Sequence, residues 1–366
     1  MTSENMKEYG RLKPMLDALE KLVRCESPSE DLAACRAVVD MASQIAHEVL
    51  GTPAQVKEIE GRPIFWWGAQ EPEVLILAHL DTVWPHGSFQ PIWEVVDDRL
   101  RGPGTFDMKA GFIQALFALK DISGSVALVA TTDEETGSQS SKALIKDLSS
   151  RAKAVLVLEA SLDGKLKTGR KGTAMYQVKV HGLAAHAGLE PEKGINATTE
   201  IAHIILALAA LENVEHGTTV VPTLLRSGKT TNTVPDLAIL DIDIRSFLMS
   251  ELERVDHAIK SLIATNPGAR LEVTGGVNRP PLEPSATQEL YERAEKVAAQ
   301  LGMAPLGSAS VGGASDGNFA AAAGAQVLDG LGAVGGGAHA PTEWVKISSL
   351  QERSDFLNAF IKDLLK

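Results

Sequence analysis

The segment EVLILAHLD, residues 73–81, is a short apolar run that ends in a histidine and an aspartate. Two further runs of the same kind are SVALVAT, residues 125–131, and AVLVLEA, residues 154–160. Nearly continuous apolar runs of this length are typical of strands that are covered on both faces, as in a parallel sheet. Helical patterns lie between them at residues 108–120 and 140–148. This alternation predicts right-handed βαβ units in an α/β domain.

The pattern changes in the middle of the chain, where several strands alternate apolar and polar side chains and so have one solvated face. The elements indicated there are strands at 175–182, 218–225, 237–247 and 270–276 and helices at 195–211 and 250–265. Their order, β-α-β-β-α-β, is typical of a small ferredoxin-like sandwich. We therefore predict an α/β domain from residues 1–169 and 281–366, with a mixed, largely parallel sheet and helices on both faces. An α+β domain at residues 170–280 is inserted into it.

Composition narrows the class of protein. The 366 residues suffice for two domains, and 44% of them are hydrophobic. Acidic residues number 47 against 35 basic ones, and this excess argues against nucleic acid or an anionic membrane as the main partner. Two cysteines, Cys25 and Cys35, are too few for a disulfide framework or a thiolate metal cluster. With a polar N-terminus and no apolar run near the ~18 residues of a membrane span, a cytoplasmic protein is expected.

Acidic residues and histidines follow the three apolar runs at the point where each run ends. His79 and Asp81 close the first run, Glu134 and Glu135 follow the second, and Glu159 closes the third. In open α/β sheets the ligand crevice lies outside the carboxyl ends of the strands, so we expect these side chains to meet there. Each one alone is compatible with a solvated turn or a buried ion pair. Their joint occurrence favours a functional site.

Two more candidates lie in glycine-rich loops. Asp107 belongs to RGPGTFDMKAG, residues 101–111, where it could also cap the helix that follows. His339 belongs to LGAVGGGAHAP, residues 331–341. His, Asp and Glu ligands without cysteine suit Zn, Co or Mn, and a shared carboxylate lets two ions sit about 3.5–4 Å apart. Asp81, two residues beyond His79, is well spaced to orient that imidazole from behind.

Six segments, in order over about residues 75–345, resemble the motif set of the M20 metallopeptidase family. They are HLDTVWPHG, GPGTFDMKAG, TTDEETGS, LEAS, AAHAGLEPEKGINA and GGGAHAPTEWV. Two more segments, GGASDGNF and DGLGAVGGGAHA, are similar to the glutamate carboxypeptidase branch of that family, the carboxypeptidase G2 type. The resemblance implies a zinc-peptidase-type catalytic domain and an inserted domain that serves as lid and dimerisation domain.

The resemblance also implies a ligand set for two divalent ions, most simply zinc, with cobalt or manganese as alternatives. His79 and Glu159 would bind one ion. Glu135 and His339 would bind the other, and Asp107 would bridge the two.

Acid–base and substrate roles follow from the same resemblance. Glu134 would be the general base, and Asp81 belongs with it to the catalytic set. His186 in AAHAGLEP would hold the developing oxyanion, often across a dimer in this family, although it also reads as an exposed loop histidine. Asn232 and Arg245 resemble substrate-contacting positions, but Arg245 could instead pair with an acidic neighbour on its own strand. Arg279, in NRPP, resembles the arginine that binds a substrate carboxylate.

We therefore predict an enzyme that hydrolyses an amide or peptide bond and releases a C-terminal amino acid, preferably glutamate. Its substrate would be a small peptide or an N-acyl amino acid. An alternative is an N-acyl-amino-acid deacylase of the acetylornithine deacetylase, desuccinylase or aminoacylase type. A third possibility is an inactive relative kept for binding or assembly, although no ligand or base is missing. A homodimer through the inserted domain is expected, and neither nucleic acid nor a membrane is expected as a partner.

Overall fold

The computed structural model describes residues 10–366, which divide into two compact units. The first unit contains the described part of Met1–Gly169 together with Pro284–Ser310 and Ser315–Lys366. The second unit contains Arg170–Glu283 and the short segment Val311–Ala314. Each unit has a hydrophobic core of its own.

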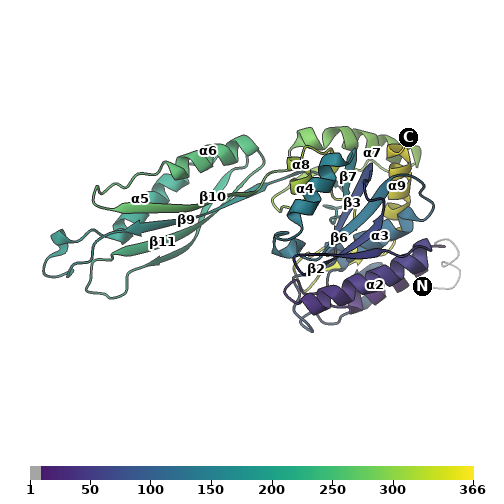
Figure 1. Cartoon of the computed structure of the whole chain (residues 1–366), viewed down its shortest axis with the longest axis horizontal. Coiled ribbons are helices and arrows are strands. Elements are labelled where there is room, and N and C mark those ends of the chain that lie inside the picture. The colour runs from purple at the N-terminus through teal and green to yellow at the C-terminus, as the bar shows by residue number, and fades with distance from the viewer. Residues whose placement is uncertain (1–9) are drawn as a thin grey trace. The chain divides into compact units, whose positions relative to one another are not determined.

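The main sheet of the first unit has the strand order β1-β2-β6-β3-β7-β14, and its strands β2, β6, β3 and β7 are labelled in Figure 1. Its strands are β1 (Gln55–Ile59), β2 (Arg62–Gly68), β3 (Val74–His79), β6 (Val126–Thr131), β7 (Ala154–Val157) and β14 (Val327–Leu328). The neighbours β6, β3, β7 and β14 run parallel. At one edge, β2 pairs antiparallel with β6, and β1 pairs antiparallel with β2. Every residue of β3, β6 and β7 is buried, as their continuous apolar sequences predicted.

Helices cover both faces of this sheet. They are α1 (Leu12–Arg24), α2 (Leu32–Leu50), α3 (Ala110–Leu119), α4 (Lys142–Arg151), α7 (Gln288–Gln300), α8 (Asp316–Ala322) and α9 (Ser349–Leu364). On one face α3 contacts α1, α2 and α9. On the other face α4 and α8 contact each other, and Val157 of β7 lies beside Gly317 of α8. The predicted mixed, largely parallel α/β fold is confirmed.

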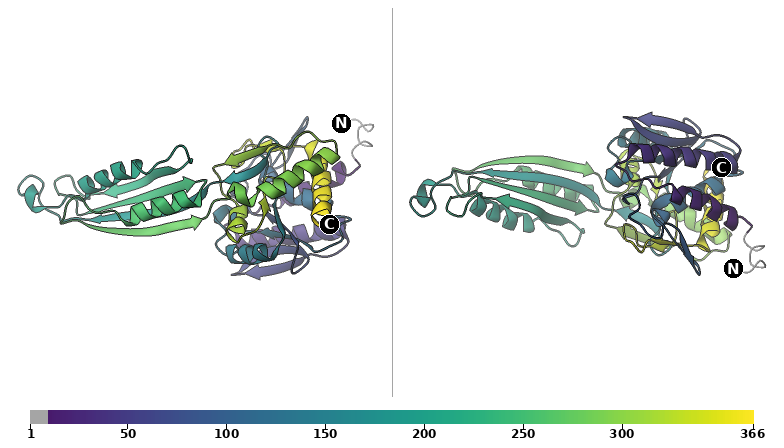
Figure 2. Two further views of the ribbon diagram at one scale, coloured as in Figure 1. Left: turned by 90° about the horizontal axis from the view of Figure 1, so that it is seen from above. Right: turned by 90° about the horizontal axis from the view of Figure 1, so that it is seen from below.

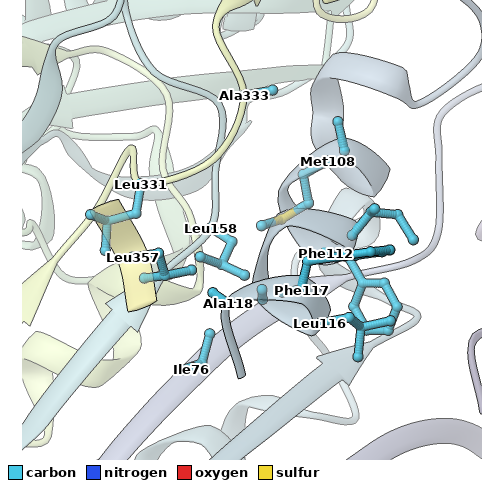
Figure 3. Close-up of a cluster of buried hydrophobic side chains, with 14 of the residues drawn as sticks. Ile76, Met108, Phe112, Leu116, Phe117, Ala118, Leu158, Leu331, Ala333 and Leu357 are labelled. Carbon is cyan, nitrogen blue, oxygen red and sulfur yellow. The ribbon is translucent and has the colours of Figure 1, made fainter. Parts of the chain in front are cut away.

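The core between the sheet and α3 is built from large side chains. All residues of α3 are buried, and its Phe112 packs edge-on against Phe65 of β2 with ring centroids 5.0 Å apart. Figure 3 shows Phe112 and Leu116 of α3 in one cluster with Ile76 of β3 and Leu357 of α9. This packing fixes the helix that directly follows the Asp107 loop.

Short elements complete the first unit. A small antiparallel sheet has the order β15-β16-β5-β4, and β13 pairs with β8. These strands are β4 (Glu94–Val96), β5 (Arg99–Arg101), β8 (Leu166–Arg170), β13 (Ser308–Val311), β15 (Gly335–Gly336) and β16 (Trp344–Lys346). Single helical turns are η1 (Thr105–Lys109), η2 (Glu134–Thr136) and η4 (Pro284–Ala286), and η3 (Pro191–Lys193) lies in the second unit.

The second unit is a four-stranded antiparallel sheet with the order β10-β11-β9-β12. Its elements are β9 (Gly172–His181), α5 (Ala197–Ala209), β10 (Thr219–Ser227), β11 (Leu237–Ser246), α6 (Met249–Lys260) and β12 (Arg270–Arg279). Both helices lie on one face of the sheet (Figure 2). Alternate β9 side chains such as Tyr176 and Val178 are buried beneath them, which leaves the other face open. This is the predicted ferredoxin-like arrangement.

None of the helices within residues 10–366 combines the length and the apolar character that crossing a membrane requires.

Candidate metal centre

Three neighbouring parallel strands of the first unit deliver candidate ligands to one edge of the sheet. His79 is the last residue of β3 and pairs in register with Thr131, the last residue of β6. Glu134 and Glu135 form the turn η2 that follows β6, and Glu159 lies two residues beyond β7. Since the carboxyl ends of parallel strands coincide, the topology alone brings these side chains together.

The first cluster of donor atoms forms around His79, whose side chain is only 1% exposed. Its Nε2 atom lies 3.3 Å from Oδ1 of Asp107 and 3.7 Å from Oε1 of Glu159. On the other side of the ring, Nδ1 lies 3.1 Å from the main-chain oxygen of Asp81. A carboxylate oxygen of Glu134 also lies within 4.8 Å of the ligand atoms of His79 and Glu159.

The second cluster forms around His339, on the glycine-rich loop before β16. Its Nε2 atom lies 3.0 Å from Oε2 of Glu135 and 3.5 Å from Oδ2 of Asp107. The two oxygens of Asp107 therefore face different histidines, Oδ1 toward His79 and Oδ2 toward His339. This is the arrangement in which one carboxylate can be shared by two metal ions.

The loop of Asp107 is irregular, and its carboxylate does not cap α3. The residue before α3 is Lys109, and no side chain accepts a capping hydrogen bond there. Asp107 and Met108 have non-helical backbone angles inside η1, and the peptide bond between them is cis. The capping alternative for Asp107 is therefore not realised, and its carboxylate points into the cluster instead.

The charges of the cluster are strongly interdependent. Burial lowers the pKa of His79, but hydrogen bonds with Asp107 and Asp81 outweigh burial and hold this pKa well above its ordinary value. Burial would raise the pKa of Asp107, yet its contact with His79 lowers it to about 2. The hydrogen bond with Glu135 raises the pKa of His339 to about 9, while burial raises the pKa of Glu135.

Protons on the two imidazoles thus balance a group of carboxylates. Divalent cations would supply the same positive charge, and binding them would release these protons. The donors are imidazole nitrogens and carboxylate oxygens without a thiolate, which fits Zn, Co or Mn.

Asp81 supports both clusters from behind, and its side chain is fully buried. Its Oδ2 atom accepts hydrogen bonds from the Ser29 hydroxyl at 2.8 Å and from the Glu135 amide at 3.2 Å. Its Oδ1 atom lies 3.5 Å from Nδ1 of His79 and accepts no hydrogen bond from any other group within residues 10–366. Asp81 therefore connects the His79 ring with the backbone of Glu135.

Glu343 also lies in this region, although it was not among the site residues predicted from the sequence. Its buried carboxylate accepts hydrogen bonds from the backbone amides of Phe106 and Asp107, and burial raises its pKa to about 7. The only signal in the sequence was its place in AHAPTEWV, four residues after His339. Lys167 was missed as well, and its Nζ atom lies 3.9 Å from Oε2 of Glu159.

The other predicted residues lie in the second unit as two pairs. His186 and Asn232 are exposed neighbours, since the amide of Ala187 donates to the Asn232 carbonyl at 2.9 Å. The loop of His186 follows β9, which ends at His181. The loop of Asn232 precedes β11, whose first residue, Leu237, pairs with His181, so both loops lie at the same end of the sheet. Arg245 and Arg279 both pair with Thr173, at the opposite end of β9.

Arg245 and Arg279 differ in their surroundings. Arg245 Nε donates to Oδ1 of Asp243 at 3.0 Å, so the strand-face pairing considered from sequence is present. Its Nη1 atom also donates to the Gly312 carbonyl at 3.3 Å. Arg279 is only 8% exposed at the end of β12.

Two imidazoles and four carboxylates thus lie together at the carboxyl edge of the α/β sheet and form a candidate centre for divalent metal ions. The sequence model of Peptidase family M20/M25/M40 matches residues 75–363. The chain therefore belongs to peptidase family M20 and is a metallopeptidase, which confirms the resemblance found in its motifs.

The similar proteins include a carboxypeptidase and a desuccinylase. Carboxypeptidase G2 from Pseudomonas sp. (strain RS-16) is 30% identical over 308 residues, covering 80% of this chain and 74% of the relative. Succinyl-diaminopimelate desuccinylase from Sulfurovum sp. (strain NBC37-1) is 24% identical over 318 residues, covering 80% and 84%. The solved structure of aminopeptidase PepT from Bacillus cereus ATCC 10987 has a TM-score of 0.79 at 22% identity, covering 97% of this chain and 99% of that chain. This last likeness shows a common fold.

Proposed function

We propose that this metallopeptidase uses two divalent metal ions, most simply zinc, to hydrolyse an amide bond. His79 and Glu159 would hold one ion, Glu135 and His339 would hold the other, and Asp107 would offer one oxygen to each. Once bound, such ions lower the pKa of a water molecule and polarise the amide carbonyl. The observation that carries the proposal is the Asp107 carboxylate, whose oxygens face His79 and His339 separately.

Glu134 is the general base in this proposal. It stands beside the ligand Glu135 on η2, with a carboxylate oxygen within 4.8 Å of the donor atoms of His79 and Glu159. It takes a proton from the attacking water, whose oxygen bonds to the carbonyl carbon. The carbon–nitrogen bond then breaks, and Glu134 gives the proton to the leaving nitrogen.

The variant Glu134→Gln tests this role because it keeps the size of the side chain and removes the base. We expect turnover to fall about 10²- to 10⁴-fold while two metal ions per chain remain bound. Metal content is measured by mass spectrometry and turnover by release of the amino acid. Glu71→Gln, at a carboxylate that is 79% exposed, serves as the control and should behave like the wild type. Wild-type turnover in Glu134→Gln, or loss of its metals, would contradict the assignment.

The proposed product is a C-terminal amino acid, preferably glutamate. Support comes from the similarity to Carboxypeptidase G2 and from the two arginines, Arg245 and Arg279, at one end of the second unit's sheet. A guanidinium group binds a carboxylate through two parallel hydrogen bonds, as Arg245 does with Asp243. A substrate carboxylate at Arg245 would therefore replace or share this partner.

A second candidate function is removal of an N-acyl group from an amino acid, which the similarity to succinyl-diaminopimelate desuccinylase favours. One assay separates the two functions by measuring the release of amino acid from a panel of substrates. The panel contains N-acyl-glutamates, N-acyl-ornithine, N-succinyl-diaminopimelate and dipeptides, and each is tested with zinc, cobalt or manganese. Fastest release of glutamate from varied acyl groups supports the first function. Strict dependence on one acyl group supports the second.

We also propose a homodimer formed through the second unit. Its edge strand β10 has neighbours on one side only, and Val221, Leu224 and Leu225 on it are each more than 40% exposed. Unpaired edges with apolar side chains are natural sites for pairing with a second chain. Arg279 pairs with Thr173 at one end of β9, whereas His186 lies in the loop that follows the other end. The two ends of this ten-residue strand are roughly 30 Å apart at the usual rise per residue. One small substrate would therefore meet Arg279 of one subunit and the histidine of the other.

A cytoplasmic location is proposed on the chemistry of the cysteines. Cys25 and Cys35 are both free thiols. Burial raises the pKa of Cys35 to about 11, so this thiol stays protonated at neutral pH. Unpaired cysteines of this kind fit a reducing compartment.

A further inference from the structure

Glu343 is only 1% exposed, and hydrogen-bond donors surround both of its carboxylate oxygens. Its Oε1 atom accepts from the amides of Phe106 at 2.8 Å and Asp107 at 3.1 Å. Its Oε2 atom accepts from the amide of Gly104 at 3.1 Å and from the indole Nε1 of Trp84 at 3.0 Å. A single buried carboxylate thus binds two separate segments of the chain.

The turn from Gly104 to Asp107 needs such an acceptor. Gly104 has a φ of 68°, and the Asp107 backbone is non-helical, so neither a regular helix nor a strand supplies acceptors for these amides. Buried amides without an acceptor would be costly. The carboxylate of Glu343 satisfies three of them and thereby fixes the peptide planes next to Asp107.

The carboxylate of Glu343 also connects to the chain segments that carry the other proposed ligands, His79 and His339. Trp84 lies five residues after His79, and its ring packs edge-on against Phe89 with centroids 4.9 Å apart. Glu343 itself follows His339 in the same loop, where its amide donates to the Ala340 carbonyl at 2.9 Å. The segments that carry His79, Asp107 and His339 therefore meet at one side chain that is not itself among the proposed metal ligands.

We propose that Glu343 is a positioning residue of the metal centre: it holds the Asp107 carboxylate between the two histidines and so sets the affinity for the metal ions. This inference rests on the metal centre proposed above and adds to it a residue outside the ligand set. Residues behind a ligand commonly change metal affinity or activity by about 10- to 100-fold when they are replaced.

The variant Glu343→Gln is a sharp test because glutamine keeps the shape but can accept at one oxygen only. Its amide group must place an NH2 against either the Phe106 and Asp107 amides or the Gly104 and Trp84 donors. We expect zinc affinity to fall about 10- to 100-fold, measured on the full chain by competition with a chromophoric chelator. Trp84→Phe keeps an aromatic ring, removes one of the four donors and should cause a smaller loss.

Glu295→Gln is the matched control. Glu295 of α7 also accepts hydrogen bonds from two backbone amides, those of Leu306 and Gly307, and from the hydroxyl of Tyr291. Its replacement should lower the temperature of unfolding without changing zinc affinity. A general loss of stability is thereby separated from a specific effect on the metal centre.

The outcomes are distinguishable. Wild-type zinc affinity in Glu343→Gln would overturn this inference even if the wild type binds two ions and hydrolyses amides. If Glu343→Gln does not fold, unchanged affinity in a folded Trp84→Phe overturns it, and reduced affinity there supports it. Failure of the wild-type protein to bind metal would instead overturn the proposed function.

Discussion

Asp107 contacts both histidines of the cluster, and each contact uses a different oxygen atom. In Asp107→Asn one of these oxygens becomes an NH2 group, which cannot bind a metal ion. We therefore expect this variant to retain fewer than two metal ions per chain after gel filtration and to lose at least about 10²-fold in turnover. The readouts are metal content and amino acid release. Two tightly bound ions together with normal turnover would contradict a bridging role.

The fold of the variant should be unaffected, since Asp107 does not cap α3. Near-ultraviolet circular dichroism of the metal-free protein checks this point. Loss of this signal would mean that Asp107 acts through the structure of its loop.

Single residues also show what a sequence can predict about a site. The proximity of His79, Glu134 and Glu159 was predictable, because they stand where apolar runs end and the strand ends of a parallel sheet meet at one edge. Glu343 was not predictable in this way. Its carboxylate accepts hydrogen bonds from backbone amides of a segment that lies 236 residues earlier in the chain, and no residue pattern marks such a contact.

For helices and strands, the agreement between the predicted and the observed residue ranges depends on how long and regular the hydrophobic pattern of each element is. The buried strands β3, β6 and β7 match their apolar runs closely, and β11 matches its alternating sequence. The small sheet of β4, β5, β15 and β16 was not predicted, because strands of two or three residues are too short to show a period.

A second difference concerns where α3 begins. The helical pattern starts at residue 108, but the regular helix starts at Ala110. Asp107 and Met108 take non-helical backbone angles, and the loop is held by the carboxylate of Glu343 instead of by helical hydrogen bonds. Tertiary contacts here override the local preference of the sequence.

A prediction at this scale concerns α6 and its junction with β10. Glu251 in the first turn of α6 accepts hydrogen bonds from Arg254 at 2.8 Å and from the Thr218 hydroxyl at 2.9 Å. The hydrogen bond from Arg254 is the main cause that lowers the pKa of Glu251 from 4.5 to about 2. Because this pKa is lowered in the folded state, the stabilisation is complete above about pH 4.5. It is lost as the pH falls toward 2.

We expect Glu251→Gln to reduce the free energy of unfolding at pH 7 by about 1.5–3 kcal/mol, the usual range for hydrogen bonds to a charged group. The difference from the wild type should shrink below pH 4.5 and disappear near pH 2. Urea denaturation of both proteins at several pH values measures it. A difference that stays constant across this range would show that the carboxylate charge is not what stabilises the junction.

At the scale of the whole molecule, the two units have separate hydrophobic cores, and the proposed catalytic residues are divided between them. Glu134 belongs to the first unit and His186 to the second. If the homodimer forms as proposed, a complete site combines Glu134 of one subunit with the histidine of the other. Two inactive variants can then repair each other, which makes the proposal open to a direct test.

Mixing Glu134→Gln with His186→Ala, after mild denaturation and joint refolding, should restore activity that neither variant has alone. Random reassociation gives mixed dimers in about half of the cases, and each mixed dimer holds one complete site, so about a quarter of wild-type turnover is expected. The control is the same mixture without the refolding step, in which activity should stay low. Because His186 lies at the end of the sheet opposite Arg279, we expect rescue. Absence of rescue in mixtures shown by mass analysis to contain mixed dimers would place His186 in the site of its own chain.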